Sequence, residues 1–258
     1  MGSRIGGLAG VVGLAALLAL ACAQKPDPAV VHRDAGDDRI QKGDHAGAAA
    51  EYQQSLAANP KQEPVWEKLA LCRVRLGDRD GAAAALLETL PFKRNPEQKA
   101  ELYRNAAGIY LQSPERDKAE KYLLEVLKLV PDDETTLSWL AEMEAERGGA
   151  RSNDAPATPE HLDAALRYYR RLAELRPTSS APLAHQRIVL SKYMQYLASR
   201  RTAAEQALRW KKKGEVAETR QRIDEIQRRA GEIQGELDGV NRKLAELRRP
   251  KATPASDR

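Results

Sequence analysis

The stretch Gly43-Asp44-His45-Ala46-Gly47-Ala48-Ala49-Ala50-Glu51-Tyr52, closed by Pro60, decides the fold of this 258-residue chain. A turn glycine is followed by a small residue, then by an aromatic one, and a proline ends the unit. The same order returns further along, because Gly77 and Ala82 lie 34 residues after Gly43 and Ala48. A fixed period of this length indicates pairs of helices stacked side by side.

The composition also favours helix along the whole chain. The hydrophobic fraction is 42%, with much alanine and a single Phe, and 31% of the residues are charged. Alanine and most charged residues are good helix formers, whereas the aromatic and β-branched runs of strands are missing. The net charge of +5 is too small by itself to indicate nucleic acid binding. An ordinary bundle of alanine-rich helices is the alternative to a repeat array.

The spacing of these residues resembles the tetratricopeptide repeat, in which two antiparallel helices form each unit. The resemblance implies an all-α fold, a right-handed superhelix of about four repeats plus a capping helix. A separate heptad period after it predicts a long coiled-coil helix. The repeat domain is expected at 29–210 and the coiled-coil helix at 214–249. Within the domain we expect repeats at 29–62, 63–96, 100–133 and 134–179, a loop insertion at 149–158, and the capping helix at 180–210.

Close packing explains why the pattern needs small residues. Each helix pair buries one face against the next, so the points where helices cross need small side chains. Large apolar residues then fill the space one turn away. The residues assigned to repeat packing are Gly43, Ala48, Tyr52, Pro60, Trp66, Leu69, Gly77, Ala82, Tyr110, Ala119, Pro131, Ala165, Tyr169 and Pro177.

In the tetratricopeptide family the first helices of the repeats line a concave surface that holds a peptide. The set of Lys and Asn residues with which some members clamp a terminal carboxylate is missing here. The surface is therefore expected to be mixed in charge and partly apolar, and an ordinary solvated face is the alternative. The candidate groove residues are Arg33, Asp37, Glu67, Leu71, Arg104, Leu111, Ser138, Glu142 and Glu146.

The N-terminus has the pattern of a targeting segment. Arg4 precedes an apolar run from Ile5 to Ala21, which is typical of a signal peptide at 1–21. The end, Leu18-Ala19-Leu20-Ala21-Cys22, resembles a bacterial lipobox, with Ala19 where Leu is usual. The resemblance implies that Cys22 is lipidated and that residues 22–28 form a tether. Ala19-Leu20-Ala21 also fits ordinary signal peptidase, giving a secreted protein, and a retained membrane anchor is the third possibility.

The C-terminal third has a different period. Apolar residues step by three and four, which is typical of a coiled-coil seam. Its flanking charges give a parallel homodimer no opposite-charge pair, so antiparallel pairing, another chain, or packing back along the repeats stay open. Gly231, Gly235 and Gly239 form a stripe roughly opposite the seam, a possible second contact face. The seam residues are Val216, Ile223, Ile226, Ile233, Leu237, Val240, Leu244 and Leu247.

The functional expectation is a non-catalytic scaffold in the bacterial cell envelope. No catalytic motif, metal-ligand spacing or cofactor motif is present in the sequence, and no nucleic acid partner is expected. A lipid-anchored protein on the periplasmic side of the outer membrane would bind other envelope proteins through the groove and the coiled-coil arm. Lipoproteins of similar build include pilotins and subunits of outer-membrane assembly machines. The alternative is a structural envelope protein that docks on peptidoglycan or an anionic polymer through Arg209–Lys213 and the arm. A tail at 250–258 is expected to be disordered.

Overall fold

A computed structural model of the chain describes residues 25–152, 156–211 and 214–248. Over these residues all regular structure is helical and no strand occurs, which confirms the predicted all-α fold. The predicted signal peptide, Cys22 and the tail at 250–258 lie outside the described residues. None of the helices in the described part is long and apolar enough to cross a membrane.

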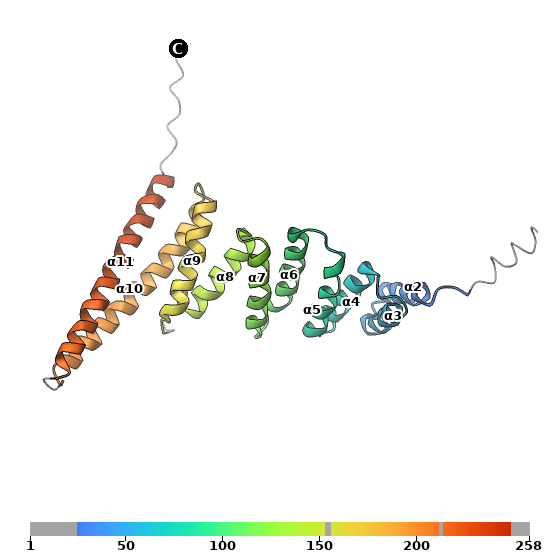
Figure 1. Ribbon diagram of the computed structural model, residues 1–258, viewed down its shortest axis with the longest axis horizontal. Coiled ribbons are helices and arrows are strands. Elements are labelled where there is room, and N and C mark those ends of the chain that lie inside the picture. The colour runs from blue at the N-terminus through green and yellow to red at the C-terminus, as the bar shows by residue number, and fades with distance from the viewer. Residues whose placement is uncertain (1–24, 153–155, 212–213, 249–258) are drawn as a thin grey trace, which may run out of the picture. The chain divides into compact units, whose positions relative to one another are not determined.

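Successive helices follow one another in antiparallel pairs (Figure 1). The elements are α2 (Pro28–Gln41), α3 (His45–Ala58), α4 (Glu63–Arg75), α5 (Arg79–Leu87), a 3-10 turn (Leu90–Phe92), α6 (Pro96–Leu111), α7 (Arg116–Leu129), α8 (Glu134–Arg147), α9 (Pro159–Leu175), α10 (Ser180–Leu208) and α11 (Val216–Arg248).

The chain forms two compact units, unit 1 up to Ala119 and unit 2 from Glu120 onward. In unit 1, α2 packs on α3, α3 on α4, α4 on α5 and α5 on α6. In unit 2, α8 packs on α9, α9 on α10 and α10 on α11. One continuous core runs through α8 to α11 in unit 2, and a separate core in unit 1 joins α3, α4 and α5.

The turns within the first two helix pairs are built alike. Gly43 and Gly77 adopt positive φ angles of 75° and 79°, a backbone conformation that glycine takes without steric cost. Each is followed by an aspartate that caps the next helix. The Asp44 and Asp78 carboxylates accept hydrogen bonds of 2.8 and 2.9 Å from the backbone N–H three residues on. The Gly-Asp pair therefore reverses the chain and starts the second helix of each pair.

The four alanines assigned to helix crossings, Ala48, Ala82, Ala119 and Ala165, have no exposed surface. Extra methylenes at such points force side chains off their rotamers and typically cost about 1–3 kcal/mol. Three tyrosines and Leu69 are also buried, whereas Trp66 is half-buried and the prolines lie exposed in connections. These residues are Tyr52, Tyr110 and Tyr169, and the prolines are Pro60, Pro131 and Pro177.

The predicted boundary at residue 100 is wrong, because it falls inside α6. That helix begins at Pro96, whose fixed φ suits the first helical position, and the Asn95 side chain accepts a hydrogen bond of 2.9 Å from the backbone N–H of Gln98. The extra length of this unit instead lies before α6, around the 3-10 turn. Of the predicted insertion at 149–158, residues 153–155 lie outside the described residues, and the Ser152 carbonyl accepts a hydrogen bond of 2.7 Å from Lys192.

Helix α11 lies antiparallel along α10 and is the second helix of a last pair (Figure 1). Ile223, Ile233, Val240 and Leu244 are buried, while the other seam residues are half-buried except Leu247, which is 36% exposed. The expectation that the seam binds another protein is corrected, because α10 already covers it. A Cβ at Gly231, Gly235 or Gly239 would meet no atom within 4 Å, so no described residue packs closely against this stripe.

Candidate functional site

A groove of about 280 Å³ opens between α8 and α10 in unit 2. Helices α8 and α10 form its two sides, and α9 contributes two buried side chains between them. The lining residues are Glu134, Thr135, Ser138 and Trp139 of α8, Tyr169 and Leu172 of α9, Arg176 after α9, and Ala181, Pro182 and His185 of α10.

The spacing of residues along α8 and α10 explains why this groove is open. Ser138 lies one turn after Glu134 and Thr135, and His185 lies one turn after Ala181, so each set shares one helix face. Ser138 and Ala181 are small, which leaves space between the two walls. The first helices of successive pairs, α8 and α10, therefore form the sides of the groove, and the second helix α9 closes its base.

Aromatic side chains give the groove its chemistry. The Tyr169 and His185 rings meet edge to face with centroids 5.4 Å apart, and Trp139 is half-buried beside them in the lining. Burial, with a further contribution from Glu142, raises the pKa of the Tyr169 phenol to about 12, although Arg151 opposes the shift. The phenol therefore stays neutral at physiological pH. An apolar or aromatic side chain would pack well against such walls.

The charges at the edge of the groove balance one another. Arg176 forms an ion pair with Glu134, both of which line the groove. Nearby, Arg171 binds Asp132 at 2.8 Å and Glu174 at 2.8 Å. A ligand here would be selected by shape and aromatic contact rather than by net charge. The described residues hold no group of three or more His, Cys, Asp or Glu side chains suited to a metal ion.

The nine groove residues predicted from the sequence are divided between the two units, and Ser138 alone lines this groove. In unit 1, three of the charged residues already have partners: Arg33 binds Asp34 at 2.8 Å, Asp37 binds Lys68 at 2.7 Å, and Glu67 lies 3.6 Å from Lys93. Arg104 and Leu111 are half-buried, and Leu71 is 54% exposed. In unit 2, Glu142 lies 3.7 Å from Arg151, and Glu146 is exposed on α8.

Sequence reasoning missed Trp139, Tyr169, Arg176 and His185 as parts of a binding site. The repeat pattern predicts a packing role alone for Tyr169 and a capping helix from residue 180 onward. The signal was present in Ala181 and His185, which are spaced by one helical turn like the groove positions of earlier repeats. Treating α10 as the first helix of another pair would have brought these residues into the groove.

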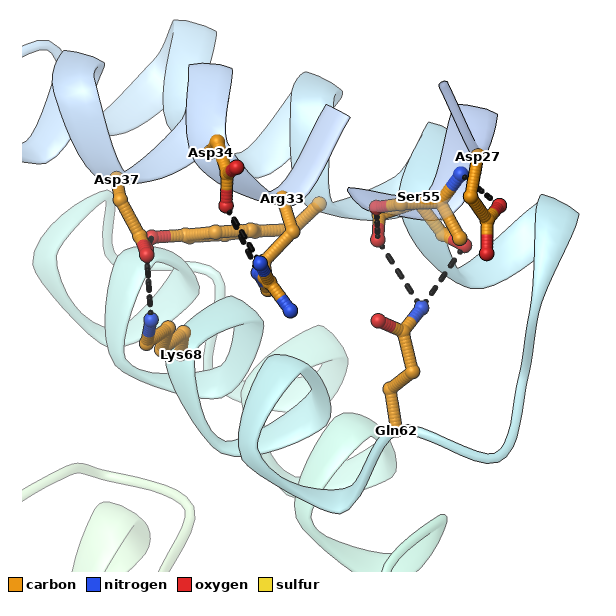
Figure 2. A network of polar contacts seen from close by, with 9 residues as sticks. Asp27, Arg33, Asp34, Asp37, Ser55, Gln62 and Lys68 are labelled. Carbon is orange, nitrogen blue, oxygen red and sulfur yellow. Dashed lines mark hydrogen bonds and ion pairs between the residues drawn. The ribbon is translucent and has the colours of Figure 1, made fainter. Parts of the chain in front are cut away.

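A cluster of one tyrosine, one aspartate and one cation ties three successive helices together near the start of unit 1. The Tyr52 hydroxyl of α3 donates a hydrogen bond of 2.6 Å to Asp37 of α2, and Lys68 of α4 binds the same carboxylate at 2.7 and 2.8 Å. Figure 2 shows Lys68 reaching from its helix to Asp37. Burial alone would raise the pKa of Asp37, but the hydrogen bonds from Lys68 and Tyr52 outweigh it and hold that pKa below its usual value.

A neighbouring set of hydrogen bonds fixes the same three-helix corner. The buried Ser55 hydroxyl of α3 donates to the Ala29 carbonyl of α2 at 2.6 Å. The Gln62 side chain, just before α4, donates to the Ser55 carbonyl at 3.1 Å and also lies 3.1 Å from its hydroxyl oxygen (Figure 2). A buried hydroxyl with partners on both sides costs little and sets how the helices are placed along one another.

The tyrosine–aspartate–cation cluster occurs again later in unit 1. Tyr110 of α6 donates to Asp80 of α5 at 2.6 Å, and Lys118 of α7 binds that carboxylate at 2.6 and 2.9 Å. Lys118 also lies 5.4 Å from the centre of the Tyr110 ring. Each of the three groups again belongs to a different one of three successive helices.

In unit 2 a third cluster of this kind fastens α11. Tyr193 of α10 donates to Asp163 of α9 at 3.0 Å, and Arg229 of α11 binds the same aspartate at 2.7 Å. The Arg229 guanidinium lies 5.4 Å from the centre of the Tyr193 ring. Cation and ring attract each other at this distance. Arginine here replaces the lysine of the two earlier clusters.

Glu236 of α11 makes a second polar link to the repeats. Arg170 of α9 binds it through two hydrogen bonds of 2.7 and 2.6 Å, and Gln186 of α10 donates at 2.6 Å. Burial acts to raise the pKa of Glu236, but Arg170 and Gln186 outweigh it and hold that pKa below its usual value of 4.5. The ionised form is therefore the one that fastens α11.

Comparison with known proteins agrees with this geometry. The family model described as tetratricopeptide repeat matches residues 39–100, which contain α3, α4, α5 and the start of α6. Residues 39–100 are a tetratricopeptide-repeat segment. No curated protein matches the chain. The repeats are a protein-interaction fold, whose stacked helix pairs create extended binding surfaces.

Among solved structures, the chain is similar to a TPR repeats protein from Bacteroides fragilis, at 14% sequence identity and a TM-score of 0.56. The likeness covers 86% of this chain and 98% of that chain, and it shows a shared fold. MamA protein is similar at 16% identity and a TM-score of 0.44, over 89% of this chain and 100% of that one. YrrB, described as a TPR protein with an unusual peptide-binding site, is similar at 14% identity and a TM-score of 0.41, over 83% and 90%.

Replacing Glu236 by Gln should reduce the stability of unit 2 in a pH-dependent way. Because the pKa of Glu236 is lower in the folded protein than in the unfolded chain, its contribution is present above about pH 4.5 and is lost as the pH falls through the folded value. We expect the variant to be less stable than the parent by about 1 kcal/mol at pH 7, since Arg170 is partly exposed. The difference should disappear on acidification, as measured by urea unfolding.

The exposed Glu246 on the same helix provides the control, as Glu246→Gln. It should leave stability unchanged at neutral pH. A Glu236→Gln variant as stable as the parent at pH 7 would contradict the assigned role of this carboxylate.

Proposed function

We propose that this protein is a non-catalytic scaffold that binds a segment of a partner protein in the groove between α8 and α10. The observation that supports this is the groove itself. Two first helices form its walls, and the half-buried Trp139 and His185 offer aromatic surface in front of the buried Tyr169. Tetratricopeptide repeats use the corresponding side of their helix pairs for binding, which supports the choice of this face.

The chemistry of the lining defines the kind of segment. A partner side chain that is apolar or aromatic would pack against Trp139, Tyr169 and His185. The hydroxyls of Thr135 and Ser138 on α8 can hydrogen-bond to the polar groups of the partner's backbone. Because Arg176 is paired with Glu134, the groove offers no free charge for a terminal carboxylate. An internal segment of a partner chain therefore fits better than a C-terminal tail.

We further propose that the scaffold acts in the bacterial cell envelope as a lipoprotein, in the manner of a pilotin or a subunit of an outer-membrane complex. The support comes from the sequence: a positive residue, an apolar run and Cys22 in a lipobox-like context. Lipidation would hold the repeats near the membrane, on the periplasmic side of the outer membrane. The groove would then be presented to other envelope proteins.

Photo-cross-linking in the native cell tests the groove. A benzoylphenylalanine placed at Thr135 or at Ala181, both exposed and both lining the groove, should give the same cross-linked partner. The same amino acid at Ile188, on α10 outside the groove, should not give it. Adding Ser138→Arg to either cross-linking variant should fill the groove. The yield of cross-linked partner should then fall at least about fivefold, which corresponds to a loss of binding free energy of about 1 kcal/mol or more.

Ser191→Arg is the matched control, since Ser191 is exposed on α10 and lies outside the groove. It should leave the cross-linked product unchanged. Products that differ between Thr135 and Ala181, or a product that survives Ser138→Arg, would show that the groove is not the binding site.

Replacing Cys22 by Ser tests the lipid anchor. The parent should incorporate radiolabelled fatty acid and fractionate with membranes, because the thiol is the only group that can carry the diacylglycerol in a lipobox. The variant should lose the label completely. A variant that is unlabelled but still membrane-bound would instead indicate a retained N-terminal anchor, and an unlabelled parent would contradict lipidation.

A further inference from the structure

A hollow lies between α10 and α11 at the end of the pair that leads into their connection. Ala203, Ala204 and Ala207 of α10 face Thr219 of α11 there, and the hollow has a volume of about 260 Å³. Further along the pair, Ile233 and Val240 of α11 are large and buried, whereas the residues at this end are small. The small side chains therefore leave space between the helices at this end.

Arginines surround this space. Arg200 of α10 and Arg222 of α11 line the hollow and also a second one of about 280 Å³ beside it, to which Tyr196 and Leu197 contribute. Both are exposed, and among the described residues neither is in an ion pair. A guanidinium binds phosphate through paired hydrogen bonds, so two unpaired arginines around one space favour a phosphate group.

The other charged residues that line the two hollows do not neutralise Arg200 and Arg222. Lys211 also lines it and binds Glu215 at 2.9 Å, while Glu218 is the one acid in its lining. Arg228 and Arg229 also line the second hollow, but Glu232 and Asp163 already neutralise them, and Glu225 is the one acid in that lining. Cations outnumber acids in both linings. The region is therefore complementary to an anionic surface.

Trp210 stands at the same end of the pair and is 88% exposed. It follows the last turn of α10, with Arg209 before it and Lys211 after it. An indole in water exposes a large apolar area, whereas tryptophan is favoured at the boundary between lipid headgroups and acyl chains. Basic residues beside an interfacial tryptophan are typical of surfaces that bind anionic membranes.

We propose that this end of the α10–α11 pair docks on an anionic phospholipid membrane, with Arg200 and Arg222 binding headgroup phosphates and Trp210 entering the interface. The occupant is a lipid surface because free cationic groups and an exposed indole lie together, while the hollows between the helices are too small for a partner helix. This contact does not depend on the groove between α8 and α10, and each can fail without the other.

Quenching of tryptophan fluorescence by brominated phosphatidylcholine tests the proposal on the full chain. The signal of Trp210 is the difference between the parent and Trp210→Phe, on vesicles with roughly one third phosphatidylglycerol and on vesicles of phosphatidylcholine alone. Co-sedimentation gives the amount of bound chain in each case. We expect Trp210 to be quenched on the anionic vesicles and not on the neutral ones, and the quenching to fall as salt is raised.

The double variant Arg200→Gln with Arg222→Gln should lower the quenching of Trp210 at least about fivefold per bound chain, as expected for the loss of two phosphate contacts. The matched control, Arg220→Gln with Arg242→Gln, removes the same charge from exposed positions of α11 outside both hollows and should keep it. Equal quenching on neutral vesicles, or an equal loss in the control, would overturn the proposal. Binding of soluble polyphosphate without any lipid quenching of Trp210 would also overturn it, in favour of an anionic polymer.

Discussion

In a stack of helix pairs every pair buries one face against the next, so the last pair needs another way to keep its apolar face from water. In unit 2 the last pair is α10–α11, and α11 buries its apolar face against α10 while its outer face is polar and exposed. Its Ile233, Val240 and Leu244 belong to the same core as Leu166 of α9 and Leu190 of α10. The core of this unit is therefore complete only when α11 is in place, and the groove between α8 and α10 depends on it through the position of α10.

Helix α11 is poorly suited to exist alone. Three glycines in its interior each cost about 1 kcal/mol relative to alanine, and an isolated helix gains little from its own hydrogen bonds. Packing against α10 and the hydrogen bonds of Arg229 and Glu236 supply the stability that the isolated helix lacks. The same sequence can thus be weakly helical by itself and well ordered in the assembled unit.

The tyrosine–aspartate–cation clusters fix the position of each helix along its neighbour, which apolar packing alone does not determine. In each of the three, an aspartate accepts from a tyrosine of the next helix and binds a cation of the helix after that. Hydrogen bonds to an ionised group depend strongly on geometry, so they fix how far one helix can slide along its neighbour. Alanine crossings set how close the helices come, and these clusters set their placement along one another.

Much of the fold could be predicted from the sequence, because the repeat pattern depends on local residue size. The alanines at 48, 82, 119 and 165 are small for a steric reason that spacing alone reveals. The repeat spacing predicts an insertion around Asn95 and Pro96, whereas in the structure Asn95 caps α6 and Pro96 begins it. The partner of α11 could not be predicted, since heptad spacing shows that a seam exists and not which helix covers it.

The candidate site was less predictable, because spacing along the sequence does not show which helices pack together. The repeat spacing of the family predicts Ser138 as a groove residue. Trp139 and His185 line the groove only because α8, α9 and α10 pack together and leave a space between them. Likewise, Arg200 and Arg222 are distant in the sequence and share a hollow because α10 and α11 run antiparallel. Sequence reasoning recognised the basic residues near Trp210 without the geometry that gathers them.

The central claim is that α11 is an integral helix of the repeat protein, docked on α10, and hydrogen exchange of the full chain measures this most directly. The account predicts that backbone amides around Ile233 and Val240 exchange as slowly as those around Val189 and Leu190 of α10. It also predicts that both sets lose protection together when Val240→Asp is introduced. Rapid exchange throughout α11 beside a well-protected α10 would contradict it, because α11 would then be a free arm.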